Sequence, residues 1–368
     1  MDILISHFSA LEVVRLQALR RALEERHRCD ALVPGRGPRD DELARLVAAA
    51  PSLSTLTTPV EVLVAGEAGR RRSRLVRTHV APRLPPAGSA FLVAPGVCCV
   101  SPEHLVVQLA PRLTELELIV LLSELMGAYS VAPELEDGMY QRRAAVTTRE
   151  LIEAHLDGLG TFAGVTRVRR ALRRACVGSG SPRETKLALR LGLNPARGGY
   201  GLDVLSMNDP LEVVRIRDRM RTGVRRPDIL LRAPAGAMRN GRPLLGAAVE
   251  YDGKDHASEE AHARDAERHN ELTAIGVVEY LVTKAQYRDL AYMDGLVDLI
   301  RRDLGTPAKR RTHAEAARLR RLRLRLYQEL ERIDGVRWDG IRRRREQAQA
   351  QGEDAGWDAV PVDAYGLD

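Results

Sequence analysis

The chain has 368 residues, of which 44% are hydrophobic and only 4% aromatic, which is enough apolar sequence for two or three domains with buried cores. No apolar run reaches the roughly 20 residues that cross a bilayer, and the first residues lack the pattern of a signal peptide. This composition excludes a disordered or membrane-spanning class and predicts a cytoplasmic protein. The cysteines lack metal-ligand spacing, so free thiols are expected at Cys29, Cys98, Cys99 and Cys176.

The net charge of +7 is concentrated near the end of the chain. Residues 301–350 hold 16 basic and 7 acidic residues, a net charge of +9, whereas residues 351–368 hold five acidic residues and no basic one. A local basic block is typical of proteins that bind phosphate or another polyanion, although a solvated helix face is the usual alternative.

Residues 1–177 predict an N-terminal α+β region. An amphipathic helix is expected from Ser9, with Glu12 completing a capping box, to about Glu25. Short β-rich runs separated by Gly and Pro predict a small sheet: VEVLVAG, RLVRTHV, AFLVA and VCCV. A helix follows with Ser101 as cap and Pro102 as its first residue, then a buried helix in LTELELIVLLSELMGAY and two more helices. The sequence VGSGSPRE predicts a hinge.

Residues 178–304 read as a separate α/β domain. The expected order is helix, three strands, helix, strand, helix, which is a mixed sheet with helices packed on it. The strands are expected near LDVLSM, PDILLR, LLGAAVEYD and VVEYLV. Residues 305–350 predict a basic helical extension, and residues 351–368 predict an acidic, disordered tail.

The third of these strands ends in two carboxylates, Glu250 and Asp252. Side chains two apart on a strand point to the same face, so both would project together. If PDILLR pairs beside this strand, Asp228 comes close, and three converging carboxylates would favour Mg²⁺ or Mn²⁺. Each residue alone also fits turn chemistry, because Asp-Gly is a common turn pair and Pro-Asp often begins a strand.

These residues, in this order, resemble the PD-(D/E)XK nuclease superfamily and, within it, the Vsr-like (very-short-patch-repair-like) endonuclease domains. The resemblance covers roughly residues 178–304 and implies a restriction-endonuclease-like fold that cleaves DNA. It implies Asp228 and Glu250 as metal ligands, with Glu184 of the opening helix assisting. Ser181, Pro182 and Glu184 also match a helix cap, so Glu184 could instead fold back onto the Ser181 amide.

One departure concerns the position two residues after the central acid. It is normally lysine in this superfamily, and here it is Asp252, which leaves activity open; Lys254 or Lys284 could take the lysine's place. His256 could act as a general base or lie in an exposed loop. Asp265 and Arg268 could pair on one helix face, or Arg268 could face the site and bind DNA there.

The N-terminal run from GVCCV to LSELMG is similar to regions of bacterial proteins related to the AbiEi-type antitoxins, which are transcriptional regulators. That resemblance implies a toxin or antitoxin partner, and no residue in this region suggests catalysis. A second copy of the chain, in a homodimer, is the alternative protein partner.

The basic extension predicts an amphipathic helix with a stripe of Leu319, Leu322, Leu326, Leu330 and Ile333. Arginines surround the stripe and are expected to bind DNA: Arg318, Arg320, Arg321, Arg323 and Arg325. Such a helix could also self-associate or lie on an anionic membrane. The hypothesis is therefore a Mg²⁺-dependent DNA endonuclease, with a non-catalytic DNA-binding regulator as the alternative.

Overall fold

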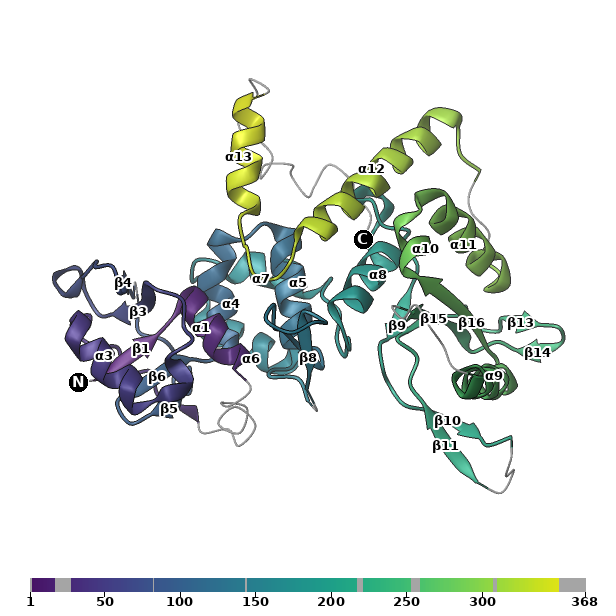
Figure 1. Ribbon diagram of the computed structural model, residues 1–368. Helices are drawn as coiled ribbons and strands as arrows, with labels where there is room; N and C mark the ends of the chain where they lie inside the picture. Colours follow the sequence, from purple (N-terminus) through teal and green to yellow (C-terminus); the bar gives the residue numbers. More distant parts are fainter. Residues whose placement is uncertain are drawn as a thin grey trace.

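The computed structural model describes residues 2–16, 28–81, 83–142, 144–216, 221–252, 259–306 and 310–350 (Figure 1). Helices flank two main sheets, which confirms the mixed α/β class. All four cysteines are free, as expected. Among the described residues, no helix is both long and apolar enough to cross a membrane. The acidic tail expected at 351–368 lies outside the described residues.

The N-terminal region is built on a six-stranded mixed sheet. Its strands, in spatial order, are β2 (Arg28–Cys29), β5 (Ala90–Ala94), β6 (Val97–Val100), β1 (Ile3–Ile5), β3 (Val60–Val64) and β4 (Val76–Val80). β1 runs parallel to β6, and β3 runs parallel to β4. The sequence predicted the last four of these strands in chain order. It missed β1, whose three buried residues are too few to show a period.

Helices pack against this sheet and form one large apolar core with it. They are α1 (His7–Arg15), α3 (Asp40–Ala49), α4 (Pro102–Leu109), α5 (Glu115–Leu125), α6 (Arg149–Leu159) and α7 (Val165–Leu172). Short 3-10 turns are η2 (Pro51–Leu53), η3 (Glu67–Gly69) and η4 (Ala110–Arg112), and a hairpin joins β7 (Tyr129–Val131) to β8 (Met139–Gln141).

Helix α4 begins as predicted, because the Ser101 hydroxyl accepts the His104 N–H and Pro102 is the first helical residue. The apolar helix expected next is α5, and nearly all of it is buried. The cap expected at Ser9 is wrong. Helix α1 begins at His7, and the buried Ser9 hydroxyl accepts the Glu61 N–H at 2.9 Å. Residues 17–25, expected to continue this helix, lie outside the described residues.

A pair of histidines in this core should make the protein sensitive to acid. Burial lowers the pKa of His104 to about 3 and also lowers the pKa of His155, whose Nε2 lies 3.2 Å from His104 Nδ1. The unfolded state binds these protons near pH 6.5 and the folded state does not, so stability is full above that pH and falls below it. We expect the melting temperature to drop between pH 7 and pH 5, and less so in His104→Gln. Equal drops in both proteins would contradict this.

The second unit is built on a four-stranded sheet in the order β16 (Val277–Thr283), β15 (Gly246–Asp252), β12 (Ile229–Arg232) and β9 (Val204–Ser206). β12 runs antiparallel to both β9 and β15, and β16 runs parallel to β15. All four strands were predicted. Two hairpins were not, namely β10 (Leu211–Val214) with β11 (Thr222–Arg225) and β13 (Met238–Arg239) with β14 (Arg242–Pro243).

Helices cover both faces of this sheet. Those of the second unit are α8 (Pro182–Gly192), α9 (Glu259–Ala274), α10 (Lys284–Arg288) and α11 (Leu290–Asp303), with the 3-10 turn η5 (Pro195–Arg197). Val249 packs in the core with α8 and α11, whereas Ala248 and Leu230 pack with Leu272 of α9. Because side chains alternate along a strand, Glu250 lies on the face that α9 covers.

The two units share helix α8 and are joined by α12 (His313–Arg332), which passes over α8 (Figure 1). Leu189 packs in the N-terminal core, whereas Leu187 packs in the second core. The segment before α8 is not an open hinge, because Ser179 is fully buried and its carbonyl accepts the Ala128 N–H at 2.8 Å. A final helix, α13 (Gly340–Ala350), follows α12.

Candidate metal and nucleic-acid site

Asp228 and Glu250 lie side by side at the end of the β12–β15 pair. Ile229 stands opposite Val249, so Asp228, one residue earlier, stands opposite Glu250. The Tyr251 N–H donates to Asp228 Oδ2 at 2.8 Å and fixes that carboxylate. The pairing of PDILLR with the strand that ends in Glu250, expected from the sequence, is therefore formed.

Burial makes this pair of carboxylates costly to ionise. Glu250 is 7% exposed. Burial and the neighbouring Asp228 carboxylate raise the pKa of Glu250 to about 8, although Arg268 acts in the opposite direction. Burial likewise raises the pKa of Asp228. Two carboxylates held together out of water favour binding of a cation or a proton.

Arg268 of α9 is the cation that the chain itself supplies to this pair. Its guanidinium forms an ion pair with Glu250, and its Nε lies 3.3 Å from Glu279 Oε1 on β16. It also donates from Nη2 to the Arg226 carbonyl at 3.3 Å. The contact with Glu250 lacks hydrogen-bond geometry, so the buried Oε1 of Glu250 has no hydrogen-bond partner in the described part of the chain. Arg268 therefore faces the site, as one of the two expectations had it, and its binding to DNA stays a prediction.

Glu184 combines the two roles that the sequence left open. Its backbone N–H is capped by the Ser181 hydroxyl at 3.1 Å, as in a helix start. Its carboxylate accepts from the Gly180 N–H at 2.7 Å and from Asn208 Nδ2 at 2.8 Å. Burial and the charge of Asp228 raise the pKa of Glu184, which places it within electrostatic reach of the site.

The other predicted residues are less close to this centre. Asp252 shares the face of Glu250 but is only half-buried. Among the described residues, no three His, Cys, Asp or Glu side chains are grouped so that they could hold a metal ion. Of the three carboxylates expected to lie together, only Asp228 and Glu250 do so. His256 and Lys254 lie outside the described residues, as does the side chain of Asp265, and Lys284 is exposed at the start of α10.

Two contributors were missed from the sequence. Glu279 stands in an otherwise apolar strand next to β15, and a charged residue in such a run is the signal that could have identified it. Asn208, with φ at 55°, sits in a turn and holds Glu184 through its side-chain amide. Its neighbour Asp209 makes an Asn-Asp pair typical of turns, which predicts the turn but not the contact.

The basic helix α12 is exposed over its first half and packs one side of its second half against the rest of the chain. Arg318, Arg320 and Arg321 are exposed. Arg323 instead pairs with Asp294 at 2.7 Å and lies over the Tyr200 ring, 4.4 Å from its centroid, while Arg325 pairs with Glu329 at 3.0 Å. Leu326, Leu330 and Ile333 pack in the N-terminal core. The C-terminal half of the apolar stripe is therefore covered by this chain rather than by a membrane.

Arg318, Arg320 and Arg321, which lie close together at the exposed start of α12, give a prediction about DNA affinity. Each phosphate contact on duplex DNA contributes about 0.9 to the slope of log affinity against log salt. Replacing Arg318, Arg320 and Arg321 by glutamine should therefore lower the slope by up to about 2.7 in fluorescence anisotropy titrations. The matched control removes three exposed arginines of the N-terminal region, at 70, 72 and 74. An equal change in the control would assign the effect to net charge rather than to α12.

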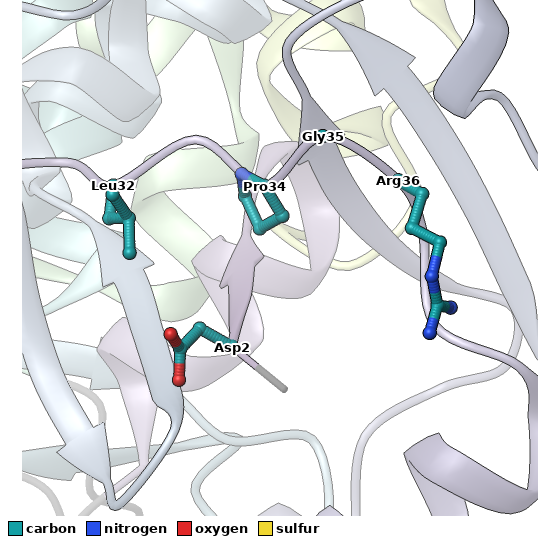
Figure 2. Close-up of a pocket in the computed structure, with 5 residues that line it drawn as sticks. All are labelled: Asp2, Leu32, Pro34, Gly35 and Arg36. Atoms are coloured by element: carbon teal, nitrogen blue, oxygen red, sulfur yellow. The ribbon is translucent and has the colours of Figure 1, made fainter.

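An open hollow of about 460 Å³ lies elsewhere, beside the N-terminal sheet (Figure 2). It is lined by Asp2, Leu32, Pro34, Gly35 and Arg36, and its two charged side chains lie apart in that view. Arg36 already pairs with Glu42 at 2.8 Å. A ligand site usually gathers several converging polar groups, and this hollow does not.

Comparison of the chain with protein-family models, with curated proteins and with solved structures finds no match. The carboxylate pair and its geometry therefore carry the functional inference by themselves.

Proposed function

We propose that the chain is a divalent-metal-dependent DNA endonuclease whose site is centred on Asp228 and Glu250. The observation that carries the proposal is the buried pairing of these carboxylates at the end of adjacent strands, within reach of Glu184. Titratable groups that are buried together and whose pKa values are raised mark a candidate functional site.

The surrounding architecture supports the same proposal. A mixed sheet flanked by helices, with the Pro-Asp aspartate beginning one strand and the central acid ending its neighbour, is the arrangement that the PD-(D/E)XK resemblance implies. A cytoplasmic location, with DNA as the partner, belongs to this proposal. A homodimer or a toxin or antitoxin partner stays a prediction.

The residues present suit a metal bound mainly through water. Mg²⁺ commonly uses one or two carboxylates and keeps several waters, so the pair suffices, and a bound metal would compete with Arg268 for Glu250 Oε1. A bound Mg²⁺ or Mn²⁺ would supply an activated water and charge stabilisation at the phosphate. The Tyr251 N–H orients Asp228, and Asn208 with Gly180 fixes the Glu184 carboxylate. Arg268 balances the charge of Glu250 and Glu279.

The second candidate is a DNA-binding regulator without catalysis. Two observations favour it, namely the Arg268 ion pair, which already partly neutralises Glu250, and the aspartate where the superfamily carries lysine. Both candidates predict DNA binding, and they differ in metal binding and cleavage.

Metal binding can be tested through thermal stability. A ligand present at about ten times its Kd stabilises the folded state by about 1.4 kcal/mol, which corresponds to a shift of a few degrees. Millimolar Mg²⁺ or Mn²⁺ should therefore raise the melting temperature of the wild type, and not that of Asp228→Asn. Asp203→Asn is the matched control, because Asp203 is exposed and paired with Arg232 on the same sheet. Equal shifts in all three proteins would remove the proposed site.

A further inference from the structure

Helix α7 and the residues directly after it carry a run of positive charge. Residues 165–175 contain five arginines and no acidic residue. One side of the helix packs in the N-terminal core through Val165, Val168, Ala171 and Leu172. The arginines therefore lie on the other side. Two of them have local partners, because Arg169 pairs with Asp157 at 2.6 Å and Arg167 donates to the Leu113 carbonyl at 2.6 Å.

Two of the remaining arginines converge with Arg197 of η5 on one carboxylate, that of Glu115 at the start of α5. The distances to its oxygens are 3.4 Å from Arg170 Nε, 3.0 Å from Arg174 Nη1 and 3.2 Å from Arg197 Nη1. Arg173 is exposed and forms no ion pair with a described residue. These five residues form the Glu115 cluster, in which four arginines stand against one carboxylate, a net charge of +3.

The excess of positive charge acts within the cluster itself. Burial and then the charge of Arg197 lower the pKa of Arg174, although Glu115 acts in the opposite direction. The buried Nε of Arg170 has no hydrogen-bond partner in the described part of the chain. The side chains of Arg170, Arg174 and Arg197 are 30%, 27% and 38% exposed, so an anion from solvent can reach them. Such an anion would relieve the repulsion that one carboxylate leaves.

The turn η5 brings the Glu115 cluster next to the basic helix α12. Gly198, with φ at 86°, lies against the α12 backbone, and a Cβ atom there would be 2.3 Å from the Leu322 carbonyl oxygen. Arg197 precedes Gly198, and Arg321 precedes Leu322. The two arginines therefore flank the same contact, and the basic surface crosses from the N-terminal unit onto α12.

The acidic side chains nearest to this surface along the chain have partners of their own. Asp157 pairs with Arg169, Glu329 of α12 pairs with Arg325 at 3.0 Å, and Glu315 accepts the Thr312 N–H at the start of α12. The surface therefore keeps its positive sign.

The surroundings of the arginines favour a duplex backbone as the anion. Residues 163–199 and 313–326 contain no Phe, Trp or Tyr, so the surface does not suit stacking on single-stranded bases. Among residues 163–199, all of which the structure describes, Val177 is the one strongly exposed large hydrophobic residue, so an anionic bilayer would bury little apolar surface. Guanidinium groups match the geometry of phosphate oxygens.

We propose that the Glu115 cluster and Arg321 hold the sugar-phosphate backbone of duplex DNA where the two units meet. Phosphate contacts fix the orientation of a duplex without reading its sequence. Glu115 would compete with the phosphates and keep the arginines in place until DNA arrives. The inference rests on the proposed DNA substrate and adds a surface linked to the candidate site by α8, which carries Glu184 in its first turn and leads into η5.

The main test uses the full chain with Arg173→Gln and Arg197→Gln combined. Arg170 and Arg174 stay to neutralise Glu115, so the carboxylate keeps its partners. In anisotropy titrations with a duplex of about 25 base pairs, the salt slope should fall by up to about 1.8 and the affinity at about 0.1 M salt by roughly tenfold or more. The matched control replaces two exposed arginines beside the N-terminal sheet, at 72 and 74, and should stay near the wild type.

A second variant changes the charge in the opposite direction. Glu115→Gln removes the carboxylate that competes with the phosphates, so duplex affinity should rise severalfold. A cluster that serves only to join α5, α7 and η5 would instead lower the melting temperature without a gain in affinity.

The outcomes separate this surface from the catalytic proposal. A lower salt slope in the double variant alone supports the surface, even if the wild type does not cleave DNA. An unchanged slope, or an equal loss in the control, would overturn it whatever the cleavage result. If the double variant does not fold, Glu115→Gln decides, because affinity at or below the wild-type value would overturn the surface. Wild-type binding to anionic phospholipid vesicles but not to the duplex would assign the cluster to a membrane and show the inference to be wrong.

Discussion

Replacing Glu250 by glutamine is expected to lower the rate of DNA cleavage by several orders of magnitude while DNA binding persists. Glutamine keeps the size of the side chain but cannot supply the negative charge that a divalent ion needs. Arg268 retains its contact with Glu279, so the packing of α9 against the sheet should survive. Because a negative charge near the phosphates is removed, duplex affinity should be equal to that of the wild type or higher.

The comparison needs a variant that removes one exposed carboxylate elsewhere. Glu346→Gln serves this purpose, because Glu346 lies on α13 with its side chain 64% exposed. Nicking rates of supercoiled plasmid, measured at saturating protein, should match the wild type in this variant. Full-rate, metal-dependent nicking by Glu250→Gln would mean that the active site lies elsewhere in the chain.

Replacing Leu330 by alanine is expected to lower the free energy of unfolding by about 2–5 kcal/mol. Leu330 is fully buried, and its helix neighbour Glu331 lies 2.7 Å from Arg183 of α8. The C-terminal half of α12 is therefore part of the packing that joins the two units. Leu324→Ala, at a position 43% exposed on the same helix, should cost far less. If urea denaturation gave the same decrease in free energy of unfolding for both variants, α12 would not pack as described.

Because α12 packs in the N-terminal core, deleting it is not a clean test of DNA binding. The sequence presents α12 as a basic extension that could be removed to test DNA binding. Deleting it also removes Leu326, Leu330 and Ile333, together worth about 5–9 kcal/mol, when whole domains are stable by only about 5–15 kcal/mol. Removal from residue 306 onward is therefore expected to unfold the chain, so substitution of the exposed arginines is the sounder test.

The strands of the candidate site were predictable because their residues follow simple periods. Glu250 ends a run of buried residues, and the pairing of two apolar strands placed Asp228 opposite it. The position of Arg268 was not predictable, because helix spacing shows which residues share a face but not which way that face turns. The periodicity of α12 likewise predicted its apolar stripe. It did not indicate that the stripe packs against the N-terminal core of the same chain.

The β10–β11 ribbon and the segment before α8 show why other features were missed. Arginines interrupt the alternation of the ribbon, so its sequence resembles a charged loop although Val213 and Leu211 anchor it. Gly, Ser and Pro at 178–182 are typical of linkers, yet Ser179 is fully buried through contacts with residues distant in sequence. Long-range packing overrides local composition at both places.

Incubation of the wild-type protein with supercoiled plasmid, in Mg²⁺ or Mn²⁺ and separately in chelator, is the most direct test of a metal-dependent site at Asp228 and Glu250. We expect nicked plasmid with the metal, none with chelator, and none from Asp228→Asn in either condition. Plasmid that stays supercoiled in every condition, while the protein binds it tightly, would contradict the endonuclease and support the regulator.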